Sequence, residues 1–323
     1  MKKRIGIIGG AGYTAGELLR LLINHPEVEI SFIHSTSNAG RAVTEVHGGL
    51  LGETDLKFSD THPLEDIDLL FLCSAHGHSK KFWEENERPA ALKVVDLAQD
   101  FRDESEGFVY GLPEANRDRI ARATLVANPG CFATAIQLSL LPLAAAGLLT
   151  PGREINVTAL TGSTGAGVKP GATTHFSWRN DNISVYKPFT HQHLAEIGRT
   201  LSRLNGGETG RINFVPMRGD FPRGIFAVTT LDCPLEEAEV TALYKNYYKD
   251  APFAVVSDAP VDLKQAVNTN KAVIHVEKHG DKLLVTCAED NLLKGASGQA
   301  VQNMNLLLGF DERTGLRLKP SAF

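Results

Sequence analysis

The chain has 323 residues, of which 42% are hydrophobic and 22% charged, and its formal net charge is −5 at pH 7; this length suits about two domains. The charge offers no basic surface for a nucleic acid, and no apolar run approaches the ~18 residues of a transmembrane helix. The four cysteines show no C-x-x-C spacing. We therefore expect a cytoplasmic protein without a bound metal and without a nucleic-acid or membrane partner.

The first half of the chain alternates short apolar strands with helical stretches. Strands are predicted over Arg4–Ile8, Glu29–His34, Leu69–Cys73, Val94–Leu97 and Thr124–Ala127. Such alternation is typical of an α/β fold, in which helices cover a parallel sheet.

After Thr150-Pro151-Gly152 the pattern changes to longer β-type runs. Strands are predicted over Glu154–Thr161, Gly224–Leu231, Ala272–Lys278 and Lys282–Cys287, and helices over Leu194–Leu204, Glu236–Tyr248 and Gly298–Leu308. This indicates an α+β domain with an antiparallel or mixed sheet. We expect a first domain over residues 1–150, completed by the C-terminal helix in 295–323, and a second domain over residues 151–294.

A glycine-rich turn follows the first strand and opens a helix. Aligned on Gly9, it reads G-x-x-G-x-x-A, a relative of the Rossmann dinucleotide fingerprint. Gly9 and Gly12 permit a tight turn and close approach of the backbone to a pyrophosphate, and Ala15 permits the helix to pack on the strand. The cofactor contacts predicted in this turn are Gly9, Gly12, Tyr13, Thr14 and Ala15. The alternative is a tight βα turn without a ligand.

The end of the second strand indicates which dinucleotide binds. An NAD site usually carries Asp or Glu there, which accepts a hydrogen bond from the ribose 2′-hydroxyl. This chain instead has His34-Ser35-Thr36-Ser37-Asn38-Ala39-Gly40-Arg41. Hydroxyls and an arginine suit a 2′-phosphate, so we predict NADP, with Ser35, Ser37 and Arg41 as contacts. The alternative is a polar loop with a surface arginine.

Asn128-Pro129-Gly130-Cys131 places a cysteine at the start of a helix, directly after a strand. Asn128 suits an N-cap, Pro129 suits the first helical position, and Ala133–Leu143 is helical in pattern. In a first helical turn a cysteine pKa can fall from ~8.5 to ~3.5–7.5. Cys131 is therefore a candidate nucleophile; the alternative is a small residue packed at the turn.

A histidine pair stands before the helix predicted at Leu194–Leu204. Thr190 is a reasonable N-cap, and His193 and Glu196 are three residues apart, so they share a helix face. His193 is a candidate acid/base and Glu196 its orienting partner, while His191 points elsewhere. The alternatives are polar surface, or a metal site that lacks a third ligand cluster.

Two further segments follow strand ends, where open α/β sheets bind ligands. Arg102 is a candidate for a substrate carboxylate or phosphate, or else forms a surface salt bridge. The small residues of 161–167 offer free amides to a phosphate or to the nicotinamide edge, or else form a flexible loop.

Together these segments resemble the N-acetyl-gamma-glutamyl-phosphate reductases of arginine biosynthesis, a family related to the aspartate-semialdehyde dehydrogenases. Eight motifs occur in family order and cover nearly the whole chain, starting at Gly12, Asp96, Tyr110, Asn128, Ser163, Thr190, Asp220 and Glu289. The resemblance implies a Rossmann-type NADP-binding domain and an α+β catalytic, substrate and oligomerisation domain of the semialdehyde dehydrogenase type. It also implies a homo-oligomer, a dimer or a tetramer.

The resemblance also implies residue roles. Cys131 would be the nucleophile, His193 with Glu196 the acid/base pair, and Asn291 a residue near the nicotinamide. The remaining expected contacts are Ser74, Ser163 and Gly165 for NADP(H), and Arg102, Asn128, His191 and Arg223 for the substrate.

The implied reaction is NADPH-dependent reduction of N-acetyl-gamma-glutamyl phosphate to N-acetylglutamate 5-semialdehyde and phosphate through a thioester on Cys131. An N-succinyl or other N-acyl substrate is an alternative. So is an aspartate-semialdehyde dehydrogenase, against which the T-H-x-H-x-x-E segment argues. Rivals from other classes are a thiol hydrolase and a non-catalytic NADP-binding regulator.

Overall fold

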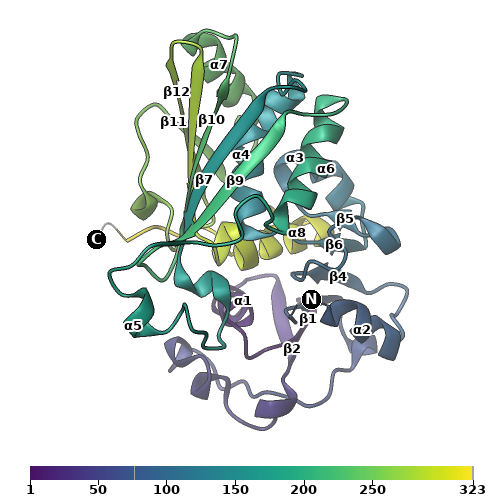
Figure 1. The fold of residues 1–323 in the computed structure, drawn as a ribbon. Helices are drawn as coiled ribbons and strands as arrows, with labels where there is room; N and C mark the ends of the chain where they lie inside the picture. The colour runs from purple at the N-terminus through teal and green to yellow at the C-terminus, as the bar shows by residue number, and fades with distance from the viewer. Residues whose placement is uncertain (76, 322–323) are drawn as a thin grey trace. The chain divides into compact units, whose positions relative to one another are not determined.

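The first apolar strand, β1 (Lys3–Ile8), lies inside a parallel sheet in a computed structural model of the chain, which describes residues 1–75 and 77–321 (Figure 1). The chain divides into two units. Unit 1 comprises Met1–Pro129 and Ala296–Arg317, and unit 2 comprises Gly130–Gly295 and the residues from Leu318 onward.

Unit 1 holds a six-stranded sheet in the order β2-β1-β3-β4-β6-β5, with every neighbouring pair parallel. Its other strands are β2 (Val28–His34), β3 (Leu69–Leu72), β4 (Lys93–Asp96), β5 (Val109–Tyr110) and β6 (Leu125–Ala127). Its helices are α1 (Tyr13–Leu22), α2 (His78–Glu85), α3 (Pro113–Ala121) and α8 (Gly298–Leu308). The predicted α/β fold with a parallel sheet is confirmed.

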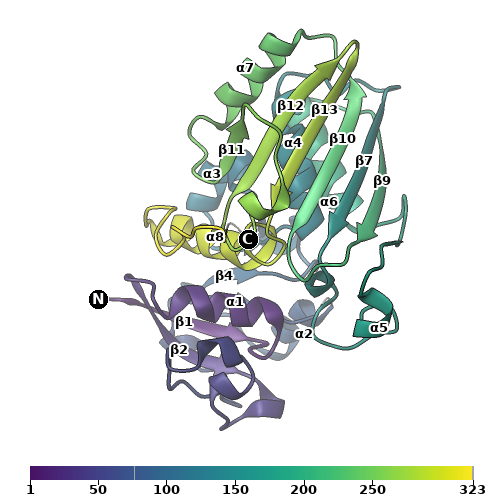
Figure 2. The same ribbon diagram turned by 90° about the vertical axis from the view of Figure 1, so that its left-hand side faces the viewer.

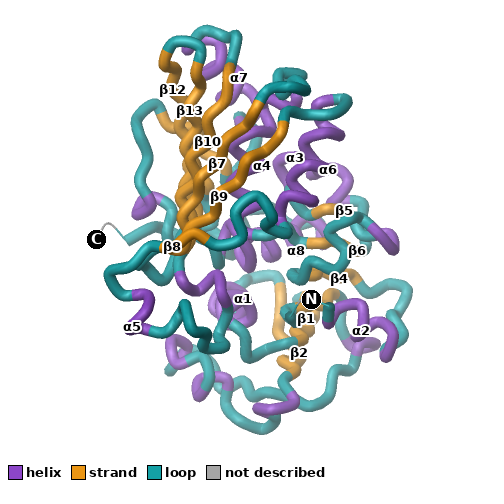
Figure 3. The backbone as a smooth tube through the Cα atoms, viewed as in Figure 1, coloured by secondary structure: helices purple, strands orange, loops and turns teal. Residues whose placement is uncertain are grey.

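The sequence of unit 1 explains this arrangement. All four residues of β3 are buried, as expected for a central strand that helices cover on both faces. Helix α8 contacts α1, α3 and β4. Between β2 and β3 the chain forms loops and short 3-10 turns (Figure 3).

Unit 2 holds a seven-stranded mixed sheet in the order β11-β12-β13-β10-β7-β9-β8, whose long strands lie side by side in Figure 2. The strands are β7 (Glu154–Thr161), β8 (Ser184–Val185), β9 (Arg211–Arg218), β10 (Ile225–Asp232), β11 (Ala254–Ser257), β12 (Ala272–His279) and β13 (Lys282–Glu289). The helices are α4 (Cys131–Ala145), α5 (Phe176–Arg179), α6 (His193–Asn205) and α7 (Glu237–Tyr248). Helix α4 packs against α6, β10 and β13.

Four strands of the two sheets, β5, β8, β9 and β11, were not predicted, because their sequences carry no clear strand pattern. β5 and β8 have two residues each and β11 has four, which is too short for an alternating pattern. β9 contains Pro216, which has no N–H for a sheet ladder. The strand tolerates Pro216 beside β8, where the Tyr186 N–H donates to the Pro216 carbonyl at 3.1 Å.

The two units divide before α4, whereas the sequence-based boundary at residues 150–151 lies after it. The reason is packing: α4 is apolar almost throughout, and Phe132 to Ala144 are all buried. Its contacts with β10 and β13 place it in the core of unit 2.

Candidate functional site

The glycine turn of unit 1 lies where β2 and β3 flank β1 on opposite sides, the position at which open α/β sheets bind nucleotides. Gly9 has a φ of +80°, and a Cβ there would lie 2.8 Å from the Cys73 carbonyl oxygen. Gly12 precedes α1, and no side chain caps that helix. The first-turn N–H groups are therefore available to a ligand anion. Ala15 is fully buried on α1.

Three other predicted cofactor contacts lie around this turn. Ser74 follows β3, and its backbone nitrogen would lie 3.1 Å from a Cβ on Gly9. The Thr14 carbonyl accepts a hydrogen bond from the Ser297 hydroxyl at 2.8 Å, which ties the start of α1 to the start of α8. Tyr13 is 42% exposed, so its ring is open to a ligand.

The predicted 2′-phosphate contacts also lie together in unit 1. Ser35, Ser37 and Arg41 follow β2, and the Asn38 side chain hydrogen-bonds to all three. Asn38 was not among the predicted contacts, and its only signal in the sequence is its place among the hydroxyl residues.

In unit 2 the structure puts Cys131 at the first residue of α4, with Gly130 as the N-cap. The prediction that Asn128 caps this helix and Pro129 begins it is therefore wrong. The first intrahelical hydrogen bond runs from the Thr134 N–H to the Gly130 carbonyl at 2.9 Å. The Cys131 thiol thus lies at the positive end of the helix dipole, a position that favours the thiolate.

The Asn128 side chain does not cap α4, because it forms hydrogen bonds with residues distant in sequence. Its amide donates to the Ala296 carbonyl at 3.0 Å and accepts from the Asn303 amide at 3.0 Å. Arg102 in turn donates to the Asn128 carbonyl at 2.9 Å and to the Leu97 carbonyl at 3.0 Å. Arg102 and Asn128, both predicted substrate contacts, thus hold the backbone that leads to Cys131.

His193 and Glu196 lie beside the start of α4. A Cβ on Gly130 would lie 2.2 Å from His193 Nε2, so the imidazole packs directly on the residue before Cys131. Glu196 accepts from the Gly130 N–H at 3.1 Å, and its other carboxylate oxygen lies 3.9 Å from His193 Nε2. Both side chains are buried, at 6% and 4% exposure. The predicted nucleophile, acid/base and orienting carboxylate are therefore brought together.

His191 has a different environment from His193. Helix α6 begins at His193 with Gln192 as N-cap, so Thr190 is not the cap that the sequence suggested. The Nδ1 atom of His191 accepts from the His193 backbone N–H at 3.2 Å. Burial, and then the charge of Lys187, lower the pKa of His191 from 6.5 to about 4.

Aromatic rings surround His191 in unit 2. The rings of Phe132, Tyr186, His193 and Phe214 lie with centroids 4.5–5.8 Å from its own. His191 is 4% exposed. The structure thus presents it as a neutral ring that holds the start of α6.

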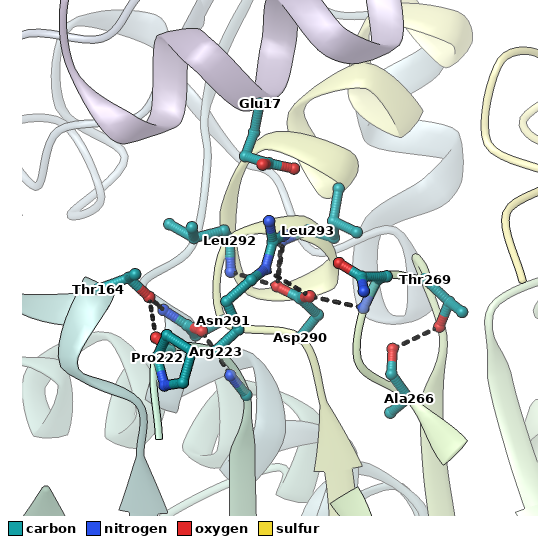
Figure 4. A network of polar contacts seen from close by, with 12 residues as sticks. Glu17, Thr164, Pro222, Arg223, Ala266, Thr269, Asp290, Asn291, Leu292 and Leu293 are labelled. Atoms are coloured by element: carbon teal, nitrogen blue, oxygen red, sulfur yellow. Dashed lines mark hydrogen bonds and ion pairs between the residues drawn. The ribbon is translucent and has the colours of Figure 1, made fainter. Parts of the chain in front are cut away.

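A polar network gathers the remaining predicted residues of unit 2 (Figure 4). Arg223 pairs with Asp290 through two hydrogen bonds of 3.0 and 3.1 Å. Asn291 accepts from the Gly224 N–H at 2.7 Å and donates to the Thr164 hydroxyl at 3.0 Å.

This network fixes the short turn Ser163–Ala166, which follows β7. The Ser163 and Thr164 N–H groups donate to the carbonyls of Phe221 and Pro222 at 2.9 and 3.1 Å. A Cβ on Gly165 would lie 3.8 Å from the Asn291 amide nitrogen. The structure therefore brings Ser163, Gly165, Asn291 and Arg223 together.

Several residues near Cys131 were not predicted from the sequence. A Cβ on Gly295 would lie 2.9 Å from Cys131 Cβ and 3.0 Å from Glu289 Oε1, so a fully buried carboxylate lies close to Cys131. Burial, and then the Cys131 thiol, raise the pKa of Tyr186 above its ordinary value. The Arg218 guanidinium lies 4.6 Å from the Tyr186 ring centroid. Glu289 begins one of the eight family motifs, and no spacing in the sequence links Tyr186 to Cys131.

Within residues 1–75 and 77–321, no three His, Cys, Asp or Glu side chains gather as a metal site would require. In the same part of the chain, no helix has the length and apolar character needed to cross a membrane.

Comparison with known proteins gives the class first. Family models described as "Semialdehyde dehydrogenase, NAD binding domain" and "Semialdehyde dehydrogenase, dimerisation domain" match residues 4–123 and 131–291. Among solved structures, aspartate semialdehyde dehydrogenase II from Vibrio cholerae, complexed with ASA, has a TM-score of 0.71 at 17% identity, over 96% of this chain and 99% of that one. The Candida albicans enzyme with NADP has a TM-score of 0.70 at 15% identity, over 95% and 98%. The chain has the semialdehyde dehydrogenase fold.

Curated relatives give the family. N-acetyl-gamma-glutamyl-phosphate reductase of Parabacteroides distasonis is 60% identical over 322 residues, which cover 99% of each chain. The Flavobacterium johnsoniae protein of the same name is 49% identical over 99% of each chain. The chain belongs to the N-acetyl-gamma-glutamyl-phosphate reductase family.

Proposed function

We propose that this chain reduces N-acetyl-gamma-glutamyl phosphate to N-acetylglutamate 5-semialdehyde, with release of phosphate, as a step of arginine biosynthesis. The observation that carries the proposal is the start of α4, where Cys131 is the first helical residue and His193 packs on Gly130. Relatives at 60% identity that bear this enzyme's name support the substrate assignment.

Cys131 begins the reaction. Its thiolate attacks the acyl carbon, the bond between that carbon and the phosphate oxygen breaks, and phosphate leaves with the bonding electrons. The product is a thioester on Cys131. The helix start stabilises the attacking thiolate, and the backbone N–H groups of that turn are placed to donate to the oxyanion of the tetrahedral intermediate.

His193 handles the proton. In the reducing direction the protonated imidazole donates to the oxyanion or to the departing thiolate; in the oxidising direction the neutral ring removes the proton of the thiohemiacetal. Glu196 lies 3.9 Å from Nε2 and holds the imidazole beside the helix start. His191 supports the backbone of His193 and stays neutral.

NADP(H) fits the residues of unit 1. The positive φ of Gly9 and the uncapped first turn of α1 form a cradle for a pyrophosphate. Ser35, Ser37 and Arg41 would hold the 2′-phosphate, and Tyr13, Thr14, Ala15 and Ser74 border the turn. When bound, NADPH supplies the hydride that reduces the thioester carbonyl. Ser163, Gly165 and Asn291 remain our candidates for the nicotinamide end, and Arg102, Asn128 and Arg223 for positioning the substrate.

We further propose that the chain forms a homo-oligomer in the cytoplasm. Along β10, buried residues alternate with half-buried ones such as Phe226 and Val228, while α4 covers the buried face. The match to a dimerisation domain over residues 131–291 supports a second copy as the cover of the other face. A Val228→Glu variant should elute as a smaller species in size exclusion with light scattering; an unchanged mass would contradict this interface.

One assay tests the activity. Purified protein is supplied with NADP, phosphate and a panel of semialdehydes, and the absorbance of the reduced cofactor is followed. Phosphate-dependent reduction of NADP with N-acetylglutamate semialdehyde is the expected result. Preference for the N-succinyl compound would show that the natural substrate carries a succinyl group. Preference for aspartate semialdehyde would identify the chain as an aspartate-semialdehyde dehydrogenase. A chain that binds NADP but oxidises none of the panel would be a regulator.

A further inference from the structure

The loop after β2 contains a side-chain cluster organised by Asn38. Its amide nitrogen donates to the hydroxyls of Ser35 and Ser37, each at 3.1 Å. Its carbonyl oxygen accepts from Arg41 Nη1 at 2.9 Å. One side chain thus holds two hydroxyls and a guanidinium side by side. We name these four residues the Asn38 cluster.

Glu45 holds Arg41 from a second direction. Its Oε2 atom accepts from Arg41 Nε at 3.0 Å, and its Oε1 atom accepts from the Ala42 N–H at 3.1 Å. The hydrogen bond from Arg41 lowers the pKa of Glu45, so the carboxylate is ionised at neutral pH. These contacts engage two of the five N–H donors of Arg41, which leaves donors for an incoming anion.

We propose that Asn38 and Glu45 set the preference of this chain for NADP(H) over NAD(H). The inference rests on the proposed use of a dinucleotide at the glycine turn. A 2′-phosphate accepts hydrogen bonds from both hydroxyls and from the guanidinium, and its charge makes those bonds stronger than any that a 2′-hydroxyl can form. Asn38 aligns the three donors before the phosphate arrives. Glu45 fixes Arg41, but its negative charge lies near the phosphate and weakens binding.

The two residues therefore act in opposite directions, and their substitutions separate the effects. Asn38→Ala removes the alignment and should raise the Kd for NADPH about tenfold, while the Kd for NADH stays within about twofold. Asn38→Asp retains an acceptor for Arg41, but it adds a negative charge and cannot donate to the hydroxyls. The Kd for NADPH should therefore rise more in Asn38→Asp than in Asn38→Ala. Glu45→Gln retains an acceptor for Arg41, gives up the acceptor for the Ala42 N–H and removes the charge near the phosphate, so the Kd for NADPH should fall about twofold.

The measurement is direct titration of the full chain with NADPH and with NADH, followed by cofactor fluorescence without substrate. Displacement by 2′,5′-ADP against 5′-AMP isolates the 2′-phosphate. Ser31→Ala is the matched control, because the Ser31 hydroxyl accepts from Arg4 Nη2 at 2.8 Å on β2, outside the cluster. It should leave both affinities unchanged.

The outcomes separate this inference from the proposed function. The inference is overturned, and the proposed function stands, if the wild type binds NADPH but Asn38→Ala raises the Kd values for NADPH and NADH equally. The same conclusion follows if Asn38→Ala changes neither Kd. If the wild type binds neither nucleotide, both fall. Should Asn38→Ala melt at a lower temperature, the opposite shifts expected for Asn38→Asp and Glu45→Gln still decide the question.

Discussion

The two histidines at the start of α6 are expected to respond differently to substitution, and His191 gives the sharper test. His191→Phe keeps an aromatic ring among Phe132, Tyr186 and Phe214 but removes the Nδ1 acceptor of the His193 N–H. His191→Asn does the reverse, because the side-chain oxygen of Asn can take the place of Nδ1 while the ring is lost.

The expected magnitude follows from the buried hydrogen bond. A buried N–H without its acceptor costs about 1–3 kcal/mol, and the cost falls on the backbone that carries the acid/base. Displacement of His193 acts on the reaction more than on ground-state binding. His191→Phe should therefore lower kcat about tenfold with little change in KM, and His191→Asn should recover most of that loss.

The pH dependence gives a second, independent readout. Above pH 6.5, His191 is neutral in both the folded and unfolded states. Between 6.5 and about 4 the unfolded chain binds a proton that folded His191 does not, so the free energy of unfolding falls as the pH is lowered. The pKa difference corresponds to about 3 kcal/mol. This loss is present in the wild type and absent from both variants, as urea unfolding at pH 7 and pH 4.5 would show.

Stopped assays of kcat and KM across pH 5–9 complete the test. If His191→Phe lowers kcat by more than about 10²-fold, and His191→Asn does not recover it, then His191 itself transfers the proton. A milder effect of His193→Ala than of His191→Phe would refute the reasoning in the same way.

The remaining predictions concern the nucleophile and its supports. Cys131→Ser should abolish turnover while NADPH affinity, measured by fluorescence, stays near the wild-type value; retained turnover would exclude the thioester. Gly130→Ala places a Cβ 2.2 Å from His193 Nε2, so kcat should fall at least tenfold, or about 1.4 kcal/mol. Its control is Gly198→Ala on α6, where a Cβ meets nothing within 4 Å and the helix should gain up to about 1 kcal/mol in thermal unfolding. Asp290→Asn breaks the pair between a buried carboxylate and the partly exposed Arg223 and should destabilise the chain by about 1–3 kcal/mol; an unchanged melting temperature would remove the network in Figure 4 from its supporting role.

The elements best predicted from sequence are those with a strong local period. The observed bounds of β7 and α8, Glu154–Thr161 and Gly298–Leu308, are those expected. In β7, buried residues alternate with more exposed ones, so the two-residue repeat is visible. By contrast, β9 was missed because Pro216 interrupts its pattern. The strand nevertheless pairs with β7, which lies far from it in the sequence.

The error at the nucleophile helix has a tertiary cause. Asn is a favoured N-cap, and Asn128 stands three residues before Cys131, so local propensity favoured it. The side chain instead bonds with the Ala296 carbonyl and the Asn303 amide. These partners are more than 160 residues away in sequence, so no local pattern could indicate them. The correction moves Cys131 from within the first turn to its first residue.

The difference between local patterns and contacts distant in sequence also explains which parts of the site were predictable. The reactivity that we propose for Cys131 depends on a helix start, which is local and therefore visible in sequence. Arg223 pairs with Asp290, 67 residues away, so no local pattern could indicate this contact; the family resemblance alone singled out Arg223. For the histidine pair, spacing places one residue on the helix, but the neutral state of its neighbour follows from surrounding rings, Phe132 and Phe214 among them. A motif thus indicates the chemistry that a site can perform, while the contacts made in the fold distinguish two identical side chains: His193 packs on Gly130, and His191 accepts from the His193 backbone N–H.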